Sequence, residues 1–216
     1  MPHSLVVVTA GLNQPSATKL LGDRLAAATA GALVEADVPS PAIEVVDLRD
    51  HAQELVHHLL TGFPGPTLGE AIRHVTAADG LIAVTPVFNA SYSGLFKLFF
   101  DVLERDGLAD TPVILAATGG SARHSLVLEH AMRPLFAYLG AATVPTAVYA
   151  ASEDWGMDAS SLDGDLVGRI RRAAGELAVA MRARTRSERP DPFQDPVPFE
   201  ELLRSPAGIR PNEPAG

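Results

Sequence analysis

The chain has 216 residues, 47% of them hydrophobic, and carries a formal net charge of −9 at pH 7. It contains no cysteine, which excludes a disulfide framework, a thiolate zinc site, a Cys-ligated iron–sulfur cluster and a cysteine nucleophile. The acidic balance argues against a protein that coats nucleic acid, because such a surface is basic, but backbone dipoles still allow a small anionic ligand.

The N-terminus has no feature of a targeting signal, because no basic segment precedes the short apolar run Ser4–Ala10. No apolar stretch reaches the roughly 20 residues that a membrane-spanning helix needs. These observations predict a cytoplasmic protein.

Short apolar runs rich in β-branched residues alternate with amphipathic stretches along the chain. The predicted strands are Leu5–Thr9, Ile43–Leu48, Gly80–Thr85, Pro112–Ala117 and Thr143–Tyr149. The predicted helices are Ser16–Ala30, Ala52–Leu60, Leu68–Ala78, the stripes Leu95-Leu98-Phe99-Val102-Leu103 and Leu128-Met132-Leu135-Phe136-Leu139, and Leu166–Met181. This alternation predicts an α/β fold with a five-stranded parallel sheet and helices on both faces.

The last part of the chain has a different composition. Seven of the 17 prolines fall within residues 190–216, and proline fits neither a helix interior nor a central strand. The sequence therefore predicts one domain over residues 1–186 and a Pro-rich tail over 187–216, either disordered or packed as an arm on another subunit.

Three loops are the candidates for a binding site, since ligands of open parallel sheets bind beyond the carboxyl ends of the strands. The first loop, residues 11–18, matches neither a dinucleotide nor a nucleotide-triphosphate motif, but places Ser16 and Thr18 at a helix start. There they suit a phosphate group, while Ser16 is equally suited to cap the helix. In the second loop, Pro86 is expected to end the strand, and Ser91 or Ser93 is a candidate cap for the next helix.

The third loop contains Gly119 and Gly120, which let the backbone approach a flat ligand closely or form an ordinary tight turn. Taken together, the segments Thr85–Lys97 (TPVFNASYSGLFK) and Ala117–Pro134 (ATGGSARHSLVLEHAMRP) resemble the NADPH-dependent FMN reductase family, and especially the alkanesulfonate-type flavin reductases of two-component monooxygenase systems. The resemblance covers about residues 4–150. The first loop departs from the family, whose members often have Gly-Ser and an arginine where this chain has Gly11-Leu12-Asn13-Gln14.

The resemblance implies a flavodoxin-like fold with strand order 2-1-3-4-5 and FMN at the switch point of the sheet. It implies NADPH or NADH as the reductant, a homodimer or homotetramer, and a flavin-dependent, luciferase-like monooxygenase that receives the reduced flavin. The residues that it assigns to FMN are Ser16, Thr18, Pro86, Val87, Phe88, Asn89, Thr118, Gly119, Gly120 and Ser121. It implies no catalytic side chain, because hydride passes directly from nicotinamide to flavin.

Pro134 lies within a helical stripe, where it cannot donate to the carbonyl of His130 and crowds that carbonyl with its ring. This predicts a kink or π-bulge around Leu126–His130. We also hypothesise that His130 contributes to an oligomer contact that tunes flavin exchange; the alternative is a kinked core helix without that role.

Other functions remain alternatives. One is an enzyme that keeps FMN bound and reduces quinones or azo dyes; another is a flavodoxin-type electron carrier. Carriers often stack aromatic side chains on the flavin, whereas the Gly-Gly loop has none and Trp155 comes after the fifth strand, which favours an enzyme. No metal site is predicted, because the sequence lacks an HExxH motif and His57 and His58 point about 100° apart on a helix.

Overall fold

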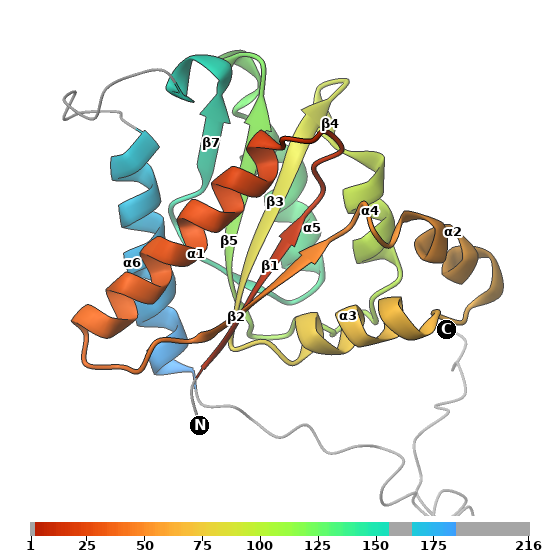
Figure 1. Ribbon diagram of the computed structural model, residues 1–216, viewed down its shortest axis with the longest axis horizontal. Helices are drawn as coiled ribbons and strands as arrows, with labels where there is room; N and C mark the ends of the chain where they lie inside the picture. Colours follow the sequence, from red (N-terminus) through yellow and green to blue (C-terminus); the bar gives the residue numbers. More distant parts are fainter. Residues whose placement is uncertain (1–2, 156–165, 185–216) are drawn as a thin grey trace, which may run out of the picture. The chain divides into compact units, whose positions relative to one another are not determined.

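The computed structural model describes residues 3–155 and 166–184 (Figure 1). The predicted tail 187–216, and the boundary that separates it from the predicted domain, lie outside the described residues.

A parallel sheet forms the centre of the fold. Its strands lie in the order β2-β1-β3-β5, and β6 and β7 both pair with β5 at the far edge. The main strands are β1 (Ser4–Thr9), β2 (Ala42–Asp47), β3 (Gly80–Phe88), β5 (Pro112–Gly119) and β7 (Val148–Ala151). Because β7 takes the fifth place, the predicted order 2-1-3-4-5 is confirmed. The inner strands are buried on both faces, which explains their continuous runs of Val, Ile and Leu.

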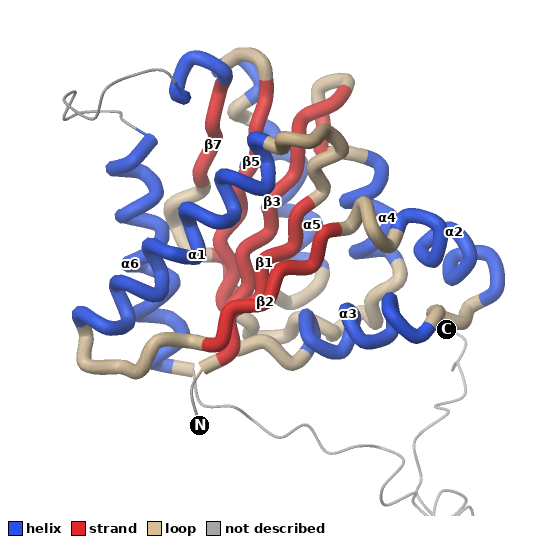
Figure 2. Tube along the Cα trace, viewed as in Figure 1, coloured by secondary structure: helices blue, strands red, loops and turns tan. Residues whose placement is uncertain are grey.

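Helices cover both faces of the sheet, as predicted (Figure 2). On one face, α1 (Ala17–Glu35) and α6 (Leu166–Ala183) pack against the sheet. The other face is covered by α2 (Ala52–Thr61), α3 (Pro66–Thr76), α4 (Gly94–Asp101) and α5 (Arg133–Tyr138). None of the helices within residues 3–155 and 166–184 combines the length and apolarity needed to cross a membrane.

The buried face of α4 differs from the predicted stripe. Phe96, Phe99 and Phe100 are buried, whereas Leu95 and Leu98 are only partly covered. The rings of Phe96 and Phe100 lie 4.7 Å apart between centroids, and both contact the aromatic ring that α5 contributes. Large rings gain more from burial than leucine does, so they determine which side of α4 faces the core.

The predicted π-bulge is confirmed in kind and lies slightly later in the chain. A π-helix, η2, spans Leu128–Met132 and leads directly into α5. The amide of Arg133 donates to the carbonyl of Leu128, five residues back. Pro134 therefore sits at the start of α5, where its missing N–H has the least effect.

The predicted fifth strand, Thr143–Tyr149, is divided in the structure. β6 (Ala142–Thr143) pairs with the start of β5, and β7 pairs with its end. The prediction of one continuous strand is wrong because Pro145 lacks the N–H that a sheet ladder requires.

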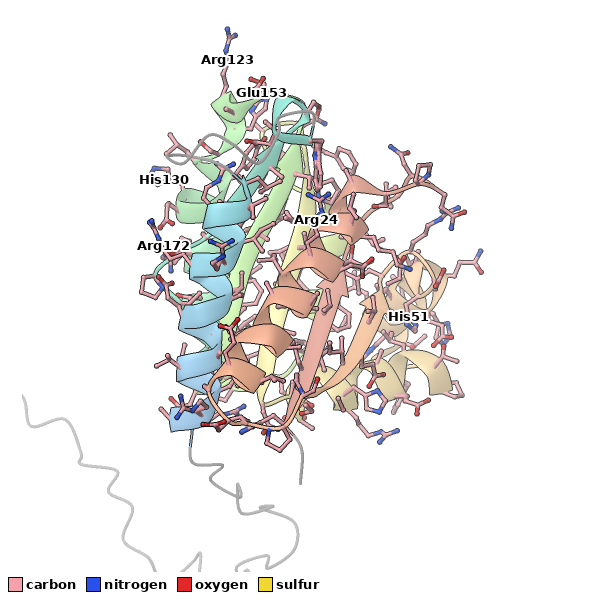
Figure 3. All side chains as sticks on the ribbon, turned by 60° about the vertical axis from the view of Figure 1, so that its left-hand side comes forward. Arg24, His51, Arg123, His130, Glu153 and Arg172 are labelled. Carbon is pink, nitrogen blue, oxygen red and sulfur yellow. The ribbon has the colours of Figure 1, made fainter. Side chains whose placement is uncertain are left out.

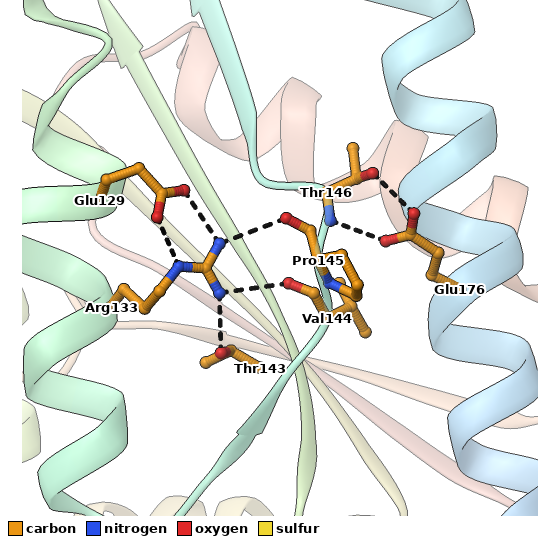
Figure 4. Close-up of polar contacts among 7 residues, drawn as sticks. All are labelled: Glu129, Arg133, Thr143, Val144, Pro145, Thr146 and Glu176. Atoms are coloured by element: carbon orange, nitrogen blue, oxygen red, sulfur yellow. Dashed lines mark hydrogen bonds and ion pairs between the residues drawn. The ribbon is translucent and has the colours of Figure 1, made fainter.

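Two charged side chains hold the segment between β6 and β7 from opposite sides (Figure 4). The guanidinium of Arg133 donates to the hydroxyl of Thr143 at 2.8 Å and to the carbonyl of Pro145 at 3.3 Å. The carboxylate of Glu176 accepts from the N–H and the hydroxyl of Thr146, each at 2.7 Å. Side chains of α5 and α6 thus replace the hydrogen bonds that the strand loses here.

Candidate functional site

The loops that follow β1, β3 and β5 meet at the carboxyl edge of the sheet, as the parallel topology requires. They line a pocket of about 370 Å³, a size suited to a small-molecule ligand. The lining residues are Gly11, Leu12, Asn13, Pro15, Ser16, Ala17, Thr18, Pro86, Val87, Phe88, Thr118, Gly119, Gly120, Ser152 and Trp155. All the predicted site residues except Asn89 and Ser121 are among them.

The first loop leads into α1 through a serine cap. The Ser16 hydroxyl oxygen accepts the N–H of Lys19 at 3.2 Å, so the predicted cap is confirmed. This bond uses a lone pair of the oxygen, and the O–H remains able to donate to a ligand. Gly11 permits the tight approach, because a Cβ atom at this position would lie 2.0 Å from the Ser16 hydroxyl oxygen. Ser16 therefore caps α1 and also lines the pocket.

Two buried threonines join the first loop to the third. The hydroxyls of Thr18 and Thr118 lie 2.9 Å apart, and both residues are almost inaccessible to solvent. One hydroxyl donates to the other, so the O–H of the accepting threonine is not used by this bond. The bond connects the start of α1 to the end of β5.

The second loop is a hairpin. β3 continues to Phe88 and pairs with the antiparallel strand β4 (Ser91–Tyr92). Asn89 and Ala90 form its turn, both with positive φ, and Asn89 lies outside the pocket lining.

The expectation that Pro86 ends the strand is wrong. Proline removes only one N–H, and the chain beyond it pairs with β4. The base of the hairpin is fixed by Thr85, whose hydroxyl accepts the N–H of Ser93 and donates to the carbonyl of Pro86, each at 3.0 Å. Ser93 caps α4, as one of the two candidate serines was expected to do.

The third loop is supported from below by Tyr149. The Tyr149 hydroxyl donates to the carbonyl of Ser121 at 2.9 Å. Burial raises the pKa of this phenol above its ordinary value, and the carboxylates of Asp154 and Glu153 act in the same direction. The side chain of Ser121 accepts the N–H of Arg123 at 3.3 Å, at the start of the short helix η1 (Ala122–His124), and does not line the pocket.

Sequence analysis missed a fourth contributor to the pocket. Ser152 and Trp155 belong to the short helix η3 (Ser152–Trp155), which follows β7. Because β7 runs parallel to β5, its carboxyl end reaches the same edge of the sheet. The predicted parallel topology already implied this placement. The prediction that Trp155 lies away from the flavin because it follows the fifth strand is therefore wrong.

Within residues 3–155 and 166–184, no group of three or more His, Cys, Asp or Glu side chains is arranged to hold a metal ion. The pocket lining contributed by these residues contains no charged or histidine side chain. What it offers a ligand is hydroxyls, backbone groups and apolar surface.

The strand order, the helices on both faces and a pocket at the ends of β1, β3 and β5 define a flavodoxin-like α/β protein. The sequence profile of the family described as "NADPH-dependent FMN reductase" matches residues 4–156. The chain belongs to this family and is, by that membership, an NAD(P)H-dependent FMN reductase.

Individual relatives agree with this assignment. The chain is 37% identical over 177 residues to "FMN reductase (NADPH)" of Pseudomonas aeruginosa, covering 82% of this chain and 91% of the relative. It is 38% identical over 180 residues to "NADH-dependent FMN reductase SfnE" of Pseudomonas putida, covering 83% and 92%. Among solved structures, an oxidoreductase from Corynebacterium diphtheriae has a TM-score of 0.80 and 41% identity, covering 85% of this chain and 99% of that one.

Proposed function

We propose that the chain binds FMN in the pocket of about 370 Å³, reduces it with NADPH or NADH, and releases reduced FMN to a separate flavin-dependent monooxygenase. The observation that carries the proposal is the convergence of three strand-end loops on one pocket. The names of the relatives support both nicotinamide coenzymes, since one is called NADPH-dependent and another NADH-dependent.

The first loop fits a phosphate group without a charged side chain. The first amides of α1 lack partners within the helix, and the helix dipole favours an anion at this end. Ser16 and Thr18 add hydroxyl donors beside these amides. A phosphate held in this way has several donors but no buried ion pair, an arrangement suited to a flavin that enters and leaves.

The second and third loops fit a flat ring. A Cβ atom at Gly120 would meet no other atom within 4 Å, so the backbone there is open to close approach. Val87 and Phe88 supply apolar surface, and Phe88 is 45% exposed. Backbone amides next to Gly119 and Gly120 are suited to stabilise negative charge on the polar edge of such a ring.

When bound, FMN supplies the hydride-accepting N5 atom of its ring system. The residues of this chain contribute orientation and exclusion of water, because the described part of the pocket lining contains no acid or base. We therefore assign no catalytic side chain.

The decisive experiment is anaerobic oxidation of NADPH and of NADH by the purified chain, with and without added FMN, together with its visible spectrum. We expect a colourless protein whose turnover requires FMN. A yellow protein that reduces quinones without added FMN would replace this proposal with the quinone or azo reductase, and a yellow protein that oxidises neither nicotinamide would replace it with the electron carrier. Trp155 lines the pocket, so the position of the aromatic side chains does not distinguish an enzyme from a carrier, whereas nicotinamide oxidation does.

A matched pair of variants tests the location of the site. Thr18→Val removes a hydroxyl at the pocket, whereas Thr29→Val makes the same change further along α1, where the hydroxyl donates to the carbonyl of Leu25. We expect Thr18→Val to raise the KM for FMN about 10-fold, in line with the loss of a hydrogen bond to a charged group. Thr29→Val should leave this KM unchanged; equal effects would place FMN elsewhere.

We also propose a homodimer or homotetramer in the cytoplasm. Light scattering of the purified full chain checks the assembly, and the His130→Ala variant tests whether the exposed His130 side chain contributes to it and to flavin affinity. Transfer of reduced FMN is checked by adding a luciferase-type monooxygenase and measuring its product.

A further inference from the structure

Trp155, the one tryptophan of the chain, is fixed at the pocket by several elements. It packs at the edge of the core that α1 and α6 form with the sheet. Its neighbour Asp154 accepts the N–H of Ala151 at 2.7 Å and a guanidinium N–H of Arg169 at 2.8 Å. Both bonds hold η3 in place, and the indole of Trp155 on this helix forms part of the pocket wall.

A cation lies against the Trp155 indole. The guanidinium carbon of Arg24, on α1, lies 5.1 Å from the centroid of the Trp155 ring, within the range of a cation–π contact. Among residues 3–155 and 166–184 the charge of Arg24 has no ion-pair partner, and the guanidinium lies against Trp155 in the wall of a pocket whose described lining is uncharged.

Two other cations, Lys19 and Arg49, lie near the first loop together with carboxylates. They line a second pocket of about 290 Å³, together with Asp23 and Asp47, and this pocket shares Gly11, Asn13, Pro15 and Ser16 with the first one. Arg24 is distinguished from these two by the contact of its guanidinium with Trp155, which lines the pocket between the three loops.

We propose that Arg24, oriented by Trp155, makes the pocket select FMN over riboflavin, the same molecule without its phosphate. This inference rests on the proposed function, which places the phosphate at the start of α1. Arg24 follows Ala17 by seven positions, a rise of about 10 Å, and helical side chains lean toward the N-terminus, which shortens the remaining distance. A full charge within about a Debye length of a phosphate acts on it by long-range attraction without direct contact.

The test is equilibrium titration of the full chain with FMN and with riboflavin, at about 50 mM and about 300 mM salt. The variants are Arg24→Gln, Arg24→Lys and the control Arg172→Gln, which removes an exposed arginine from α6, well apart from Arg24 (Figure 3). We expect Arg24→Gln to weaken the affinity for FMN about 5- to 20-fold at low salt and by less at high salt. The affinity for riboflavin should change by less than about 2-fold. Arg24→Lys should retain part of the preference, and Arg172→Gln should leave it intact.

An unchanged ratio of the two affinities in Arg24→Gln would overturn the inference, as would an equal change in Arg172→Gln. Trp155 supplies an independent readout, because its emission should be quenched when flavin binds. FMN binding detected by flavin absorbance with no change in this emission would also overturn it. If the wild type bound neither flavin, the proposed function would fall and this inference with it, so the two failures are distinguishable.

Discussion

Replacing Gly119 with alanine tests whether the third loop is shaped by Tyr149. A Cβ atom at residue 119 would lie 2.1 Å from the Tyr149 hydroxyl oxygen and 3.2 Å from the carbon that bears it. The φ of Gly119 is not positive, so the backbone accepts alanine and the cost is the collision alone. Overpacking of a filled site costs about 1–3 kcal/mol, and displacing the hydroxyl from the Ser121 carbonyl adds about 1 kcal/mol.

The destabilisation of about 2–4 kcal/mol should shift the urea midpoint by about 1–2 M, for a slope near 2 kcal/mol/M. In Tyr149→Phe the colliding oxygen is absent, and the nearest contact becomes 3.2 Å. Gly119→Ala should therefore cost about 1 kcal/mol or less in that background, which makes the two changes strongly coupled.

Gly120→Ala is the matched control, because a Cβ atom there would meet nothing within 4 Å. We expect it to leave the free energy of unfolding within about 0.5 kcal/mol of wild type while weakening FMN binding, since it enters the pocket. Equal costs of Gly119→Ala in the presence and absence of the tyrosine hydroxyl would refute the reasoning.

Three further changes have definite expected outcomes. Arg133→Ala should lower the free energy of unfolding by about 1–3 kcal/mol, because it removes the paired bonds to Glu129 and the bonds to the segment between β6 and β7. Arg133→Lys should recover less than half of this loss. Urea unfolding measures both variants. Gly11→Ala should displace the Ser16 cap and cost about 1–3 kcal/mol by the same assay, together with weaker FMN binding. Burial raises the pKa of Tyr149, so the folded state favours the neutral phenol. The stability that this preference contributes is complete below the ordinary pKa of 10.0 and is lost as pH rises through the folded-state pKa. From about pH 9 to about pH 11, wild type should lose stability more steeply than Tyr149→Phe, and parallel curves would contradict this.

The sheet could be predicted from the sequence because its inner strands are buried on both faces and read as continuous apolar runs. The break in the fifth strand was missed although Pro145 marks it, since the apolar run continues on both sides. The stripe of α4 was misplaced because periodicity alone does not rank Phe96 above Leu95. Which rings meet is decided by tertiary packing.

The loops of the site were found because they carry distinctive residues directly after strands. Trp155 was missed because it lies next to the pocket through the pairing of β7 with β5, which no local pattern records. The contacts of Thr18 with Thr118 and of Gly119 with Tyr149 likewise join residues far apart in the chain. The residues within one loop predict which chemical groups can reach a ligand, whereas such long-range contacts determine the positions of these groups.

The segment between β6 and β7, residues 144–147 and called the crossing below, must keep its length. Val148 and Ala150 point to the core beneath α1 and α6, and Tyr149 and Ala151 point to the opposite core. Deleting or inserting one residue in the crossing would exchange these two sets if the ladder kept its position. Tyr149 would then leave the third loop, although no residue of the crossing lines the pocket.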